Sequence, residues 1–461
     1  MSPRTAIVLF TRDLRVHDHA ALAEASRTAD HVVPLFVLDD DLILHAAAPN
    51  RLSFLLDALA DLRRSLQELG GDLILRRGDT TVETMRVAHA VDAVTVVVGA
   101  DASSYARRRE QRLERACEHE RRQLLVENTT AVVAAGDLTP SERDHYRVFT
   151  PYWRRWRSTT LPATLPPPDR LELPAGLDPG ALPQLSELTS GKPSPDLPHG
   201  GETEGRRRLT RWLSEGLHDY ERSRDDLAAE GTSRLSPYLH FGCVSATEVV
   251  GRAREHGGTS DAFVRQLCWR DFYLQLLAAN PRTPAEDLHS GRVDWCDDDD
   301  MLARWREGQT GYPIVDAAMR QLHHEGWLHN RARLIVGSFL AKTLNVNWRK
   351  GAEVFFDLLV DGDLANNVGN WQWVAGTGVD TRPNRVLNPI AQAKRYDPKG
   401  AYVRRHVAEL AGLPGPSVHE PWHAPPARVP PEYPRRIVDF AEATSRFRAR
   451  RRAQREHATR A

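Results

Sequence analysis

Short apolar runs alternate with helical patterns over the first 135 residues, and this alternation constrains the fold more than any other feature. The runs are rich in valine and isoleucine and cover Thr5–Thr11, Val32–Leu38, Asp72–Leu75, Ala93–Val98 and Gln123–Glu127. A helical pattern runs from Leu52 to Leu69, with Asn50 placed to cap it and Gly70-Gly71 to end it. Strands that alternate with helices predict a parallel sheet covered by helices. We therefore expect an α/β domain over residues 1–135.

The pattern changes after this domain. Ten of the 30 prolines lie between Pro162 and Pro198, which predicts an irregular linker on the surface over residues 136–203. From about Glu204 the helical period dominates and strand signals largely vanish. We expect a helical domain over 204–435 and a basic tail over 436–461. The predicted fold class is α/β plus all-α, with the two domains joined by a long linker.

Composition excludes several classes of protein. The longest apolar runs, such as Ala93–Ala100, are far shorter than the roughly 20 residues that span a bilayer. The N-terminus has no apolar signal core, and the four cysteines lie far apart without a C-x-x-C pair. We expect a cytoplasmic protein without a disulfide framework, a zinc site or a membrane partner. Basic and acidic residues balance at 62 each, but the basic tail permits a local phosphate-binding face. A solvated, arginine-rich surface is the alternative.

Two segments combine residues that suit nucleotide chemistry. Gly231–Pro237 holds three hydroxyl residues, a glycine and an arginine. Such a turn into a helix can hold a pyrophosphate, although serine and threonine there are also ordinary helix caps. Trp269–Tyr273 lies in an apolar helical pattern and includes an arginine. The pair Trp269 and Arg270 could stack a base and clamp a phosphate, or belong to the core.

A third segment is unusually polar. Asp361–Asn370 holds two aspartates, three asparagines and two glycines, a composition that disfavours a helix. We expect an asparagine-rich loop that contacts a ligand and leads into Trp371-Gln372-Trp373, with a solvated turn as the alternative. No metal site is expected. The acidic run Asp297–Asp300 suits a solvated loop, and His17 and His19 lack further ligands at metal-binding spacing. No nucleophile motif indicates a hydrolase.

Taken together, these segments resemble the photolyase/cryptochrome family of flavoproteins, most closely the class I cyclobutane pyrimidine dimer photolyases. The matching motifs occur in the family's order and span most of the chain: Thr11–Asp18, Gly231–Ser236, Trp269–Tyr273, Thr310–Met319 and Asp361–Asn367. The resemblance implies an N-terminal α/β domain joined by a long linker to a helical FAD domain.

The resemblance also implies roles for single residues. The positions that hold the FAD phosphates and ribityl chain are Tyr220, Thr232, Ser233, Leu235 and Ser236. Arg333 and Asp361 match an ion pair beside the isoalloxazine, Asp363 lies at its polar edge, and Asn367 faces flavin N5. A catalytic relay that reduces FAD by light-driven electron hops matches Trp371, Trp348 and Trp295. Each tryptophan alone could also be a core residue.

The same resemblance implies a pocket for a flipped-out pyrimidine dimer and its phosphates, formed by Arg224, Trp269, Arg270, Asn330, Arg331 and Trp373. Two pocket positions depart from dimer photolyases: Gln266 replaces a glutamate and Leu334 a methionine. Glutamine at position 266 also resembles the (6-4) photolyases. Those enzymes, however, carry histidines where this chain has Asn330 and Leu334. In the α/β domain, Arg51 and Asp101 align with an antenna pocket for 8-hydroxy-5-deazaflavin, which we expect over folate.

The sequence therefore predicts light-driven repair of cyclobutane pyrimidine dimers in damaged DNA, by electron transfer from reduced FAD in a monomeric enzyme. One alternative is a cryptochrome-type photoreceptor without repair activity. A second is a flavoprotein that binds nucleic acid passively, which the departures at Gln266 and Leu334 motivate.

Overall fold

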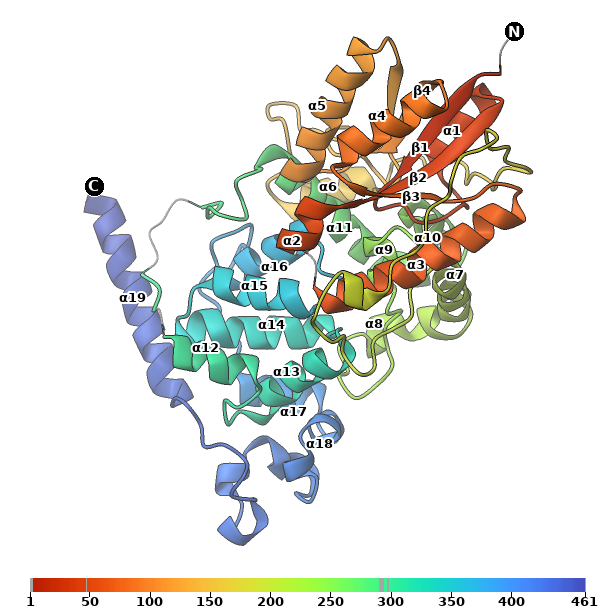
Figure 1. Ribbon diagram of the computed structural model, residues 1–461. Helices are drawn as coiled ribbons and strands as arrows, with labels where there is room; N and C mark the ends of the chain where they lie inside the picture. Colours follow the sequence, from red (N-terminus) through yellow and green to blue (C-terminus); the bar gives the residue numbers. More distant parts are fainter. Residues whose placement is uncertain (1–2, 47, 290–293, 297, 461) are drawn as a thin grey trace. The chain divides into compact units, whose positions relative to one another are not determined.

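The computed structural model describes residues 3–46, 48–289, 294–296 and 298–460 (Figure 1). Its contacts divide the chain into two compact units. The first unit, which we call the α/β unit, comprises residues 1–193, 198–221 and 233–281. The second, the helical unit, comprises residues 194–197, 222–232 and 282–461. The predicted domain limits at residues 135, 203 and 435 remain a prediction.

The α/β unit contains the predicted parallel sheet. Its five strands have the order β3-β2-β1-β4-β5 and are β1 (Thr5–Phe10), β2 (His31–Asp39), β3 (Ile74–Gly78), β4 (Ala93–Gly99) and β5 (Gln123–Glu127). All four neighbouring pairs are parallel, which confirms the predicted fold class. The limits predicted for the third strand were wrong. It begins at Ile74 and continues to Gly78, because these residues pair with Leu35–Asp39 of β2.

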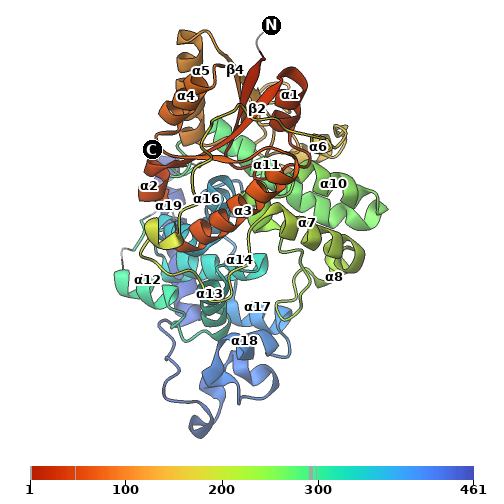
Figure 2. The same ribbon diagram turned by 45° about the vertical axis from the view of Figure 1, so that its right-hand side comes forward.

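Helices cover both faces of this sheet. The helices of this region are α1 (Ala20–Thr28), α2 (Asp40–Ala46), α3 (Pro49–Glu68), α4 (Thr80–Ala90) and α5 (Ser104–His119). All of them except α3, which packs against α7 (Glu202–Arg211), contact the strands. In both views α4 and α5 lie on one side of the strands and α1 on the other (Figures 1 and 2). The predicted cap of α3 was wrong: Asn50 lies inside the first turn and Ala48 is the N-cap. Pro49 starts the helix because its fixed φ suits the first helical position. Gly70 follows the helix with a φ of +86°.

Helices complete the α/β unit. α6 (Phe149–Trp156) lies inside the predicted linker, so the irregular connector is shorter than expected. Residues 157–201 are all described and contain one regular element, the short helix η1 (Leu185–Glu187). The elements that follow are α7 (Glu202–Arg211), η2 (Trp212–Gly216), η3 (Leu217–Asp219), α8 (Tyr220–Ser223), α9 (Ser236–His240), α10 (Ala246–Arg254), η4 (Gly257–Ser260) and α11 (Asp261–Ala279). α8 spans the division between the units.

The helical unit surrounds one large apolar core. Its helices are α12 (Asp299–Arg306), α13 (Pro313–Glu325), α14 (Asn330–Ser338), η5 (Phe339–Leu344), α15 (Trp348–Leu358), α16 (Leu364–Ala375), α17 (Pro389–Tyr396), α18 (Ala401–His406) and α19 (Phe440–Arg460), with short turns η6 to η9 between the last two. Core residues come mainly from α13 to α16, and α13 lies beside α14 (Figure 2). Within the described residues of this unit, the only strand-like pairing is the bridge between Cys296 and Val346. The prediction of a mainly helical region is confirmed.

The asparagine-rich segment is a helix, and the predicted loop was wrong from Leu364 onward. Asp363 is the N-cap of α16 and accepts from the backbone N–H of Asn366 at 2.8 Å. The side-chain amide of Asn367 donates to the Ala352 carbonyl at 2.9 Å, and that of Asn370 donates to the Asn366 carbonyl at 2.8 Å. These bonds satisfy the polar groups that would otherwise favour a turn. The helix is stable because its other face is buried in the core.

Three sequence-based exclusions can be compared with the fold. No helix in the described part of the chain is long and apolar enough to cross a membrane. All four cysteines are free. Among the described residues, no group of three or more histidine, cysteine, aspartate or glutamate side chains could hold a metal ion. Two residues of the acidic run Asp297–Asp300 make contacts within the protein: Asp298 caps the start of α12, and Asp299 forms an ion pair with Lys350. Asp297 lies outside the described residues.

Candidate active site

An ion pair between a half-buried arginine and a buried aspartate lies at the edge of the helical core. Nη2 of Arg333, on α14, donates to both carboxylate oxygens of Asp361 at 3.0 and 2.7 Å. Nε of Arg333 donates to the Leu328 carbonyl at 2.8 Å. The Asp361 side chain is 3% exposed, so the pair is shielded from solvent screening. The ion pair expected for these two residues is present, and its role toward a flavin remains a prediction.

The start of α16 continues this edge. The backbone N–H of Asp363 donates to the Asp361 carbonyl, and that of Asn367 donates to the Asp363 carbonyl. Oδ1 of Asp363 also accepts from the side-chain amide of Asn366 at 2.7 Å. Because the Asn367 amide nitrogen is used by Ala352, its carbonyl oxygen is the end that a ligand would meet as an acceptor. Arg333, Asp361, Asp363 and Asn367 therefore form one connected set, which we call the polar edge.

Trp371 lies one helical turn beyond Asn367 on α16. Its side chain is buried at 3% exposure, and its Nε1–H has no hydrogen-bond partner among the described residues. A methyl group at Gly351 of α15 would overlap the Trp371 ring, so glycine permits the close approach of the two helices. Phe355 meets the same ring edge-on, with centroids 5.0 Å apart. This packing fixes the indole in one orientation.

Trp348 is the first residue of α15 and is fully buried. Its Nε1–H donates to Oδ1 of Asp287 at 2.9 Å. The guanidinium of Arg349 stacks over the Trp348 ring, with 4.6 Å between its central carbon and the ring centroid. Nη2 of Arg349 donates to the same Asp287 oxygen at 2.9 Å. Asp287 thus contacts both the predicted relay residue and the cation above it.

Trp295 is partly buried and packs against the same core. Hydrogen bonds to Asn345 hold the residues on either side of Trp295. The Cys296 N–H donates to the Asn345 carbonyl, and the Asn345 side chain donates to the Asp294 carbonyl. The three predicted relay tryptophans therefore all belong to the helical unit. A further tryptophan was missed by sequence reasoning. Trp305 is fully buried and lies edge-on to Trp371, with centroids 6.1 Å apart; its place in an apolar helical pattern signals only a core residue.

The predicted phosphate and ribityl positions lie where the chain passes between the two units. Tyr220, Ser233, Leu235 and Ser236 belong to the α/β unit and Thr232 to the helical unit. Leu235 is buried, whereas Ser236 is exposed at the start of α9. The Ser233 hydroxyl accepts from the Leu235 N–H at 3.3 Å. The tight turn here requires a φ of +50° at Arg234, a conformation that side chains rarely adopt. Their role as flavin ligands remains a prediction.

Three of the predicted lesion residues, Gln266, Trp269 and Arg270, lie on α11. Trp269 stacks on Phe149, with centroids 3.6 Å apart and planes 4° from parallel. The Gln266 amide donates to the Ala262 carbonyl at 3.3 Å. Arg270 donates to the carbonyls of Thr130 and Leu239 at 2.6 and 3.3 Å. These bonds hold the chain segments around α11 together, so Arg270 has a structural role, and its contact with DNA phosphate remains a prediction.

The other predicted lesion residues belong to the helical unit. Asn330 is exposed at the start of α14, and Leu334, Arg224 and Trp373 are half-buried. Arg331 is already engaged. It donates to Asp225 at 3.0 to 3.2 Å and stacks over the Tyr396 ring at 4.5 Å. A DNA phosphate would therefore share this arginine with Asp225.

Burial shifts the pKa of two groups near these residues. Burial raises the pKa of Asp271, next to Arg270, to about 6. The carboxylate nevertheless accepts from the backbone N–H groups of Val132 and Val133 and from Nε1 of Trp156 at 2.9 to 3.1 Å. Burial lowers the pKa of His329, the N-cap of α14, to about 4. His329 is therefore neutral at physiological pH and serves as an acceptor for the Arg331 N–H.

The predicted antenna residues are buried in the α/β unit. Arg51, on α3, is 8% exposed, and the side chain of Asp101, in the loop after β4, is also 8% exposed. Asp101 forms an ion pair with Arg12 at 3.0 Å. The neighbouring α5 carries Arg109, which is also 8% exposed, and its Nε and Nη2 have no hydrogen-bond partner among the described residues. Nη2 of Arg109 also lies 3.9 Å from Oε1 of Glu110, an ion pair too long for a hydrogen bond.

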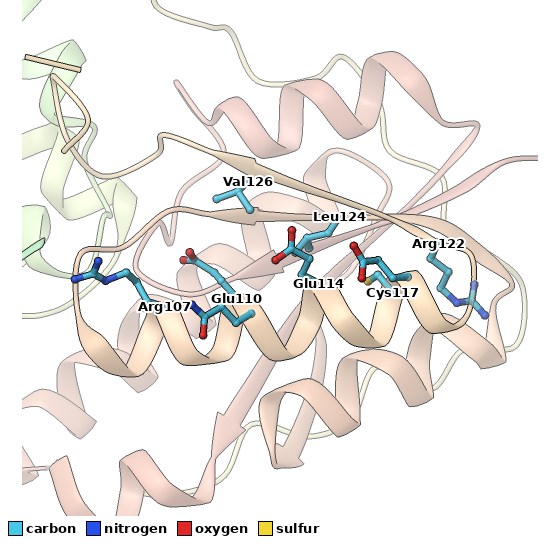
Figure 3. Close-up of a pocket in the computed structure, with 9 residues that line it drawn as sticks. Arg107, Glu110, Glu114, Cys117, Arg122, Leu124 and Val126 are labelled. Carbon is cyan, nitrogen blue, oxygen red and sulfur yellow. The ribbon is translucent and has the colours of Figure 1, made fainter. Parts of the chain in front are cut away.

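A surface pocket also lies in the α/β unit, between α5 and the edge strand β5. It has a volume of about 320 Å³ and is lined by Arg107, Glu110, Gln111, Glu114, Cys117, Glu118, Arg122, Leu124 and Val126 (Figure 3). None of the predicted site residues lines it. Burial raises the pKa of Glu110 and of the Cys117 thiol above their usual values. The thiol is therefore a poor nucleophile, and the pocket carries no recognisable chemistry.

Comparison with known proteins agrees with this architecture. The family model described as DNA photolyase matches residues 6–170, and that of the FAD binding domain of DNA photolyase matches residues 263–453. The chain is 51% identical to the deoxyribodipyrimidine photo-lyase of Streptomyces griseus, over 96% of this chain and 98% of that protein. It is 34% identical to the cryptochrome DASH of Gloeobacter violaceus, over 99% and 97% of the two chains.

A solved structure extends this similarity to the fold. The bacterial class III photolyase from Agrobacterium tumefaciens superposes with a TM-score of 0.93 at 32% identity, covering 99% of this chain and 98% of that one. The α/β unit with its parallel sheet and the helical unit with its polar edge together have the architecture of the photolyase flavoproteins. The chain belongs to the photolyase/cryptochrome family.

Proposed function

We propose that this protein is a deoxyribodipyrimidine photo-lyase, an enzyme that uses light and bound FAD to split cyclobutane pyrimidine dimers in DNA. The observation that carries the proposal is that Asp363 and Asn367 of the polar edge begin the same helix that holds the buried Trp371, in a chain that is 51% identical to a photo-lyase. The similarity extends over nearly the whole length of both proteins. A photoreceptor without repair activity is the alternative, and a repair assay distinguishes it from a photo-lyase.

The residues present fit a flavin. The ring system of FAD offers both donors and acceptors, and the polar edge supplies a guanidinium, two carboxylates and an amide within an apolar core. Trp371 adds a buried indole N–H without a protein partner, which is costly unless a ligand accepts from it. We assign the isoalloxazine to Arg333, Asp361, Asp363 and Asn367. The phosphates and ribityl chain are assigned to Tyr220, Thr232, Ser233, Leu235 and Ser236.

Bound FAD would supply a strong, light-activated one-electron donor, chemistry that no side chain provides. The protein's own residues orient it and exclude water. Asn367 presents a neutral amide, which cannot titrate and so keeps the local charge constant. The Arg333–Asp361 pair fixes local charge in a region of low dielectric, where its field acts strongly. Trp371, Trp348 and Trp295 would carry electrons inward from the surface to prepare the reduced cofactor.

The lesion-binding residues are assigned one by one from the family resemblance. Trp269 and Trp373 offer apolar indole faces to the dimer, and Gln266 can both accept from a thymine N–H and donate to a thymine carbonyl. Arg224, Arg270, Asn330 and Arg331 line the rim and would bind the DNA backbone. Asn330 and Leu334 supply no protonated imidazole, so we propose specificity for cyclobutane dimers over (6-4) products.

Three finer assignments complete the proposal. Arg51, Asp101 and the orphaned Arg109 donors support an antenna chromophore in the α/β unit, for which 8-hydroxy-5-deazaflavin is preferred over folate. We propose that the enzyme acts as a monomer on damaged DNA in the cytoplasm. FAD content and antenna identity can be read from the absorption spectrum of the purified protein after release of its ligands by denaturation.

The decisive experiment is a repair assay on two defined oligonucleotides, one with a cyclobutane dimer and one with a (6-4) product, in light and in darkness. We expect repair of the dimer in light alone and no repair of the (6-4) product. Efficient (6-4) repair would contradict the lesion assignment. A protein that holds reduced FAD and repairs neither lesion would be a photoreceptor or a passive binding protein.

A further inference from the structure

We propose that Asp287 is a positioning residue for electron transfer, which lowers the cost of oxidising Trp348 and compensates the positive charge of Arg349. The inference deepens the proposed function and rests on its tryptophan relay. Asp287 lies in the loop between α11 and α12, outside every motif that the sequence singled out. Its carboxylate accepts from Nε1 of Trp348 at 2.9 Å and from Nη2 of Arg349 at 2.9 Å, both at Oδ1.

Asp287 and Arg349 have opposite effects on the indole of Trp348. A cation over an aromatic face is attracted by the electron density of the ring, and Arg349 lies 4.6 Å above Trp348. The same charge opposes the loss of an electron from that ring. An indole that loses an electron carries a positive charge, and its N–H becomes a stronger donor. A carboxylate acceptor therefore binds the oxidised ring more tightly than the neutral ring.

Burial makes both effects large. The Trp348 side chain is fully buried, Asp287 is 17% exposed and Arg349 25% exposed. Charges in such a setting are screened less than on an open surface. Without Asp287, the positive charge of Arg349 over the Trp348 ring would have no negative partner. With it, the ring meets a nearly neutral ion pair whose negative end is the one bonded to its N–H.

The fold holds the Asp287 loop in place through the helix that carries Trp371. Gln372 of α16 is fully buried, and its amide donates to the carbonyls of Thr283 and Glu286 at 2.9 Å each. Its carbonyl oxygen accepts from the Leu288 N–H at 2.9 Å. From the other side, Nε of Arg349 donates to the Ala285 carbonyl at 3.0 Å. The loop is thus tied to both helices that carry the relay.

The electron step itself needs no further reactant. Bound FAD, held by the polar edge, would supply the light-driven one-electron oxidant, and Trp371 would be the first side chain to lose an electron. Trp348 then passes one electron to Trp371, which returns to its neutral form while Trp348 is oxidised. No covalent bond forms or breaks, and the Nε1 proton of Trp348 stays in its hydrogen bond to Asp287. Trp295 can then reduce Trp348 in the same way.

The test compares Asp287→Asn with Arg349→Gln in the full-length, FAD-containing protein. Asparagine keeps the size and an acceptor oxygen but removes the charge. Because a hydrogen bond to a charged group is roughly twice as strong as a neutral one, we expect Asp287→Asn to lower the yield of the long-lived tryptophan radical by about fivefold in transient absorption. Arg349→Gln should raise or preserve this yield. Asp299→Asn, which removes an exposed carboxylate paired with Lys350, is the matched control and should change nothing.

A second measurement needs no light. The indole N–H resonance of Trp348, assigned by its loss in Trp348→Phe, should move in Asp287→Asn, stay in place in Asp299→Asn, and be largely restored in Asp287→Glu. An equal loss of radical yield in Asp287→Asn and Arg349→Gln would indicate a purely structural role and overturn the inference. So would an unchanged yield or an unmoved resonance in Asp287→Asn. If Trp348→Phe itself leaves the long-lived radical intact, the relay of the proposed function fails instead.

Discussion

At the scale of single residues, buried polar groups in this protein connect segments that are far apart in sequence. Asp271 is the clearest case, because one carboxylate binds two backbone N–H groups after β5 and the indole of α6. Burial raises its pKa from the usual 3.8 to about 6. The folded protein therefore binds this proton more tightly than the unfolded chain does.

The sign of this shift predicts how stability depends on pH. A group with a raised folded pKa contributes stability fully below pH 4, and this contribution is lost as pH rises through about 6. Asp271→Asn does not titrate. We expect the free energy of unfolding of the native protein, relative to this variant, to fall by up to about 3 kcal/mol between pH 4 and pH 7. Urea unfolding of both proteins at several pH values measures this difference in the free energy of unfolding. A difference that does not change with pH would contradict the raised pKa of Asp271.

A second prediction at this scale concerns Trp371. Trp371→Phe should abolish most of the photoreduction of oxidised FAD, because phenylalanine is much harder to oxidise than indole. Repair of dimers by the chemically pre-reduced variant should persist, since the relay only prepares the cofactor. Trp327→Phe, which changes another buried tryptophan of the helical unit, serves as the control. Photoreduction at the normal rate in Trp371→Phe would show that electrons reach the flavin by another path.

At the scale of elements, the close approach of α15 and α16 determines where the relay lies. Gly351 is the contact point, because any side chain there would overlap the Trp371 ring and Leu340. The capped start of α16 then places Asn367 and Trp371 one turn apart on the same helix. Packing between two helices therefore positions both the polar edge and the first relay tryptophan.

Gly351→Ala tests this contact. Overpacking of a dense core costs about 1 to 3 kcal/mol, so we expect a lower free energy of unfolding and a displaced Trp371 with slower photoreduction. Gly251→Ala, in α10, is the matched control, because a methyl group there meets nothing within 4 Å. In that helix alanine should be neutral or stabilising by up to about 1 kcal/mol. Equal stability of the two variants in urea unfolding would argue against close packing at Gly351.

At the scale of the whole molecule, the charge balance of 62 basic and 62 acidic residues conceals local basic surfaces. Binding to DNA by such a protein depends on a few well-placed arginines rather than on net charge. Arg331 is one of them in the proposed lesion pocket, and 20% of its side chain is exposed beside Asp225.

Arg331→Ala should weaken binding to dimer-containing DNA and lower the salt dependence by about one phosphate contact. Arg207→Ala removes an exposed arginine from α7 that pairs with Glu204 and should leave the slope unchanged. Affinities measured at several salt concentrations give both values. An unchanged slope in Arg331→Ala would mean that Asp225 and Tyr396, rather than DNA, are the partners of this arginine.

The parallel α/β sheet, the helical second half and the family could all be predicted from the sequence. Strand and helix periods depend on residues only a few positions apart, and the motifs are contiguous, so both can be read along the chain. The Arg333–Asp361 pair also followed from matching motifs. The limits of β3 and the cap of α3 were wrong by a few residues, because the pairing partner of a strand and the first turn of a helix depend on their neighbours.

Other features depend on contacts between segments that are far apart in the sequence. The segment 364–370 has a poor helical composition, yet it is helical because Ala352, from another helix, accepts from Asn367 and because its apolar face is buried. Asp287 carries no sequence signal at all, since it lies 61 positions before Trp348 and meets it through the folded core. Local composition describes what a segment prefers alone, whereas burial and hydrogen bonding to distant segments determine which preference prevails.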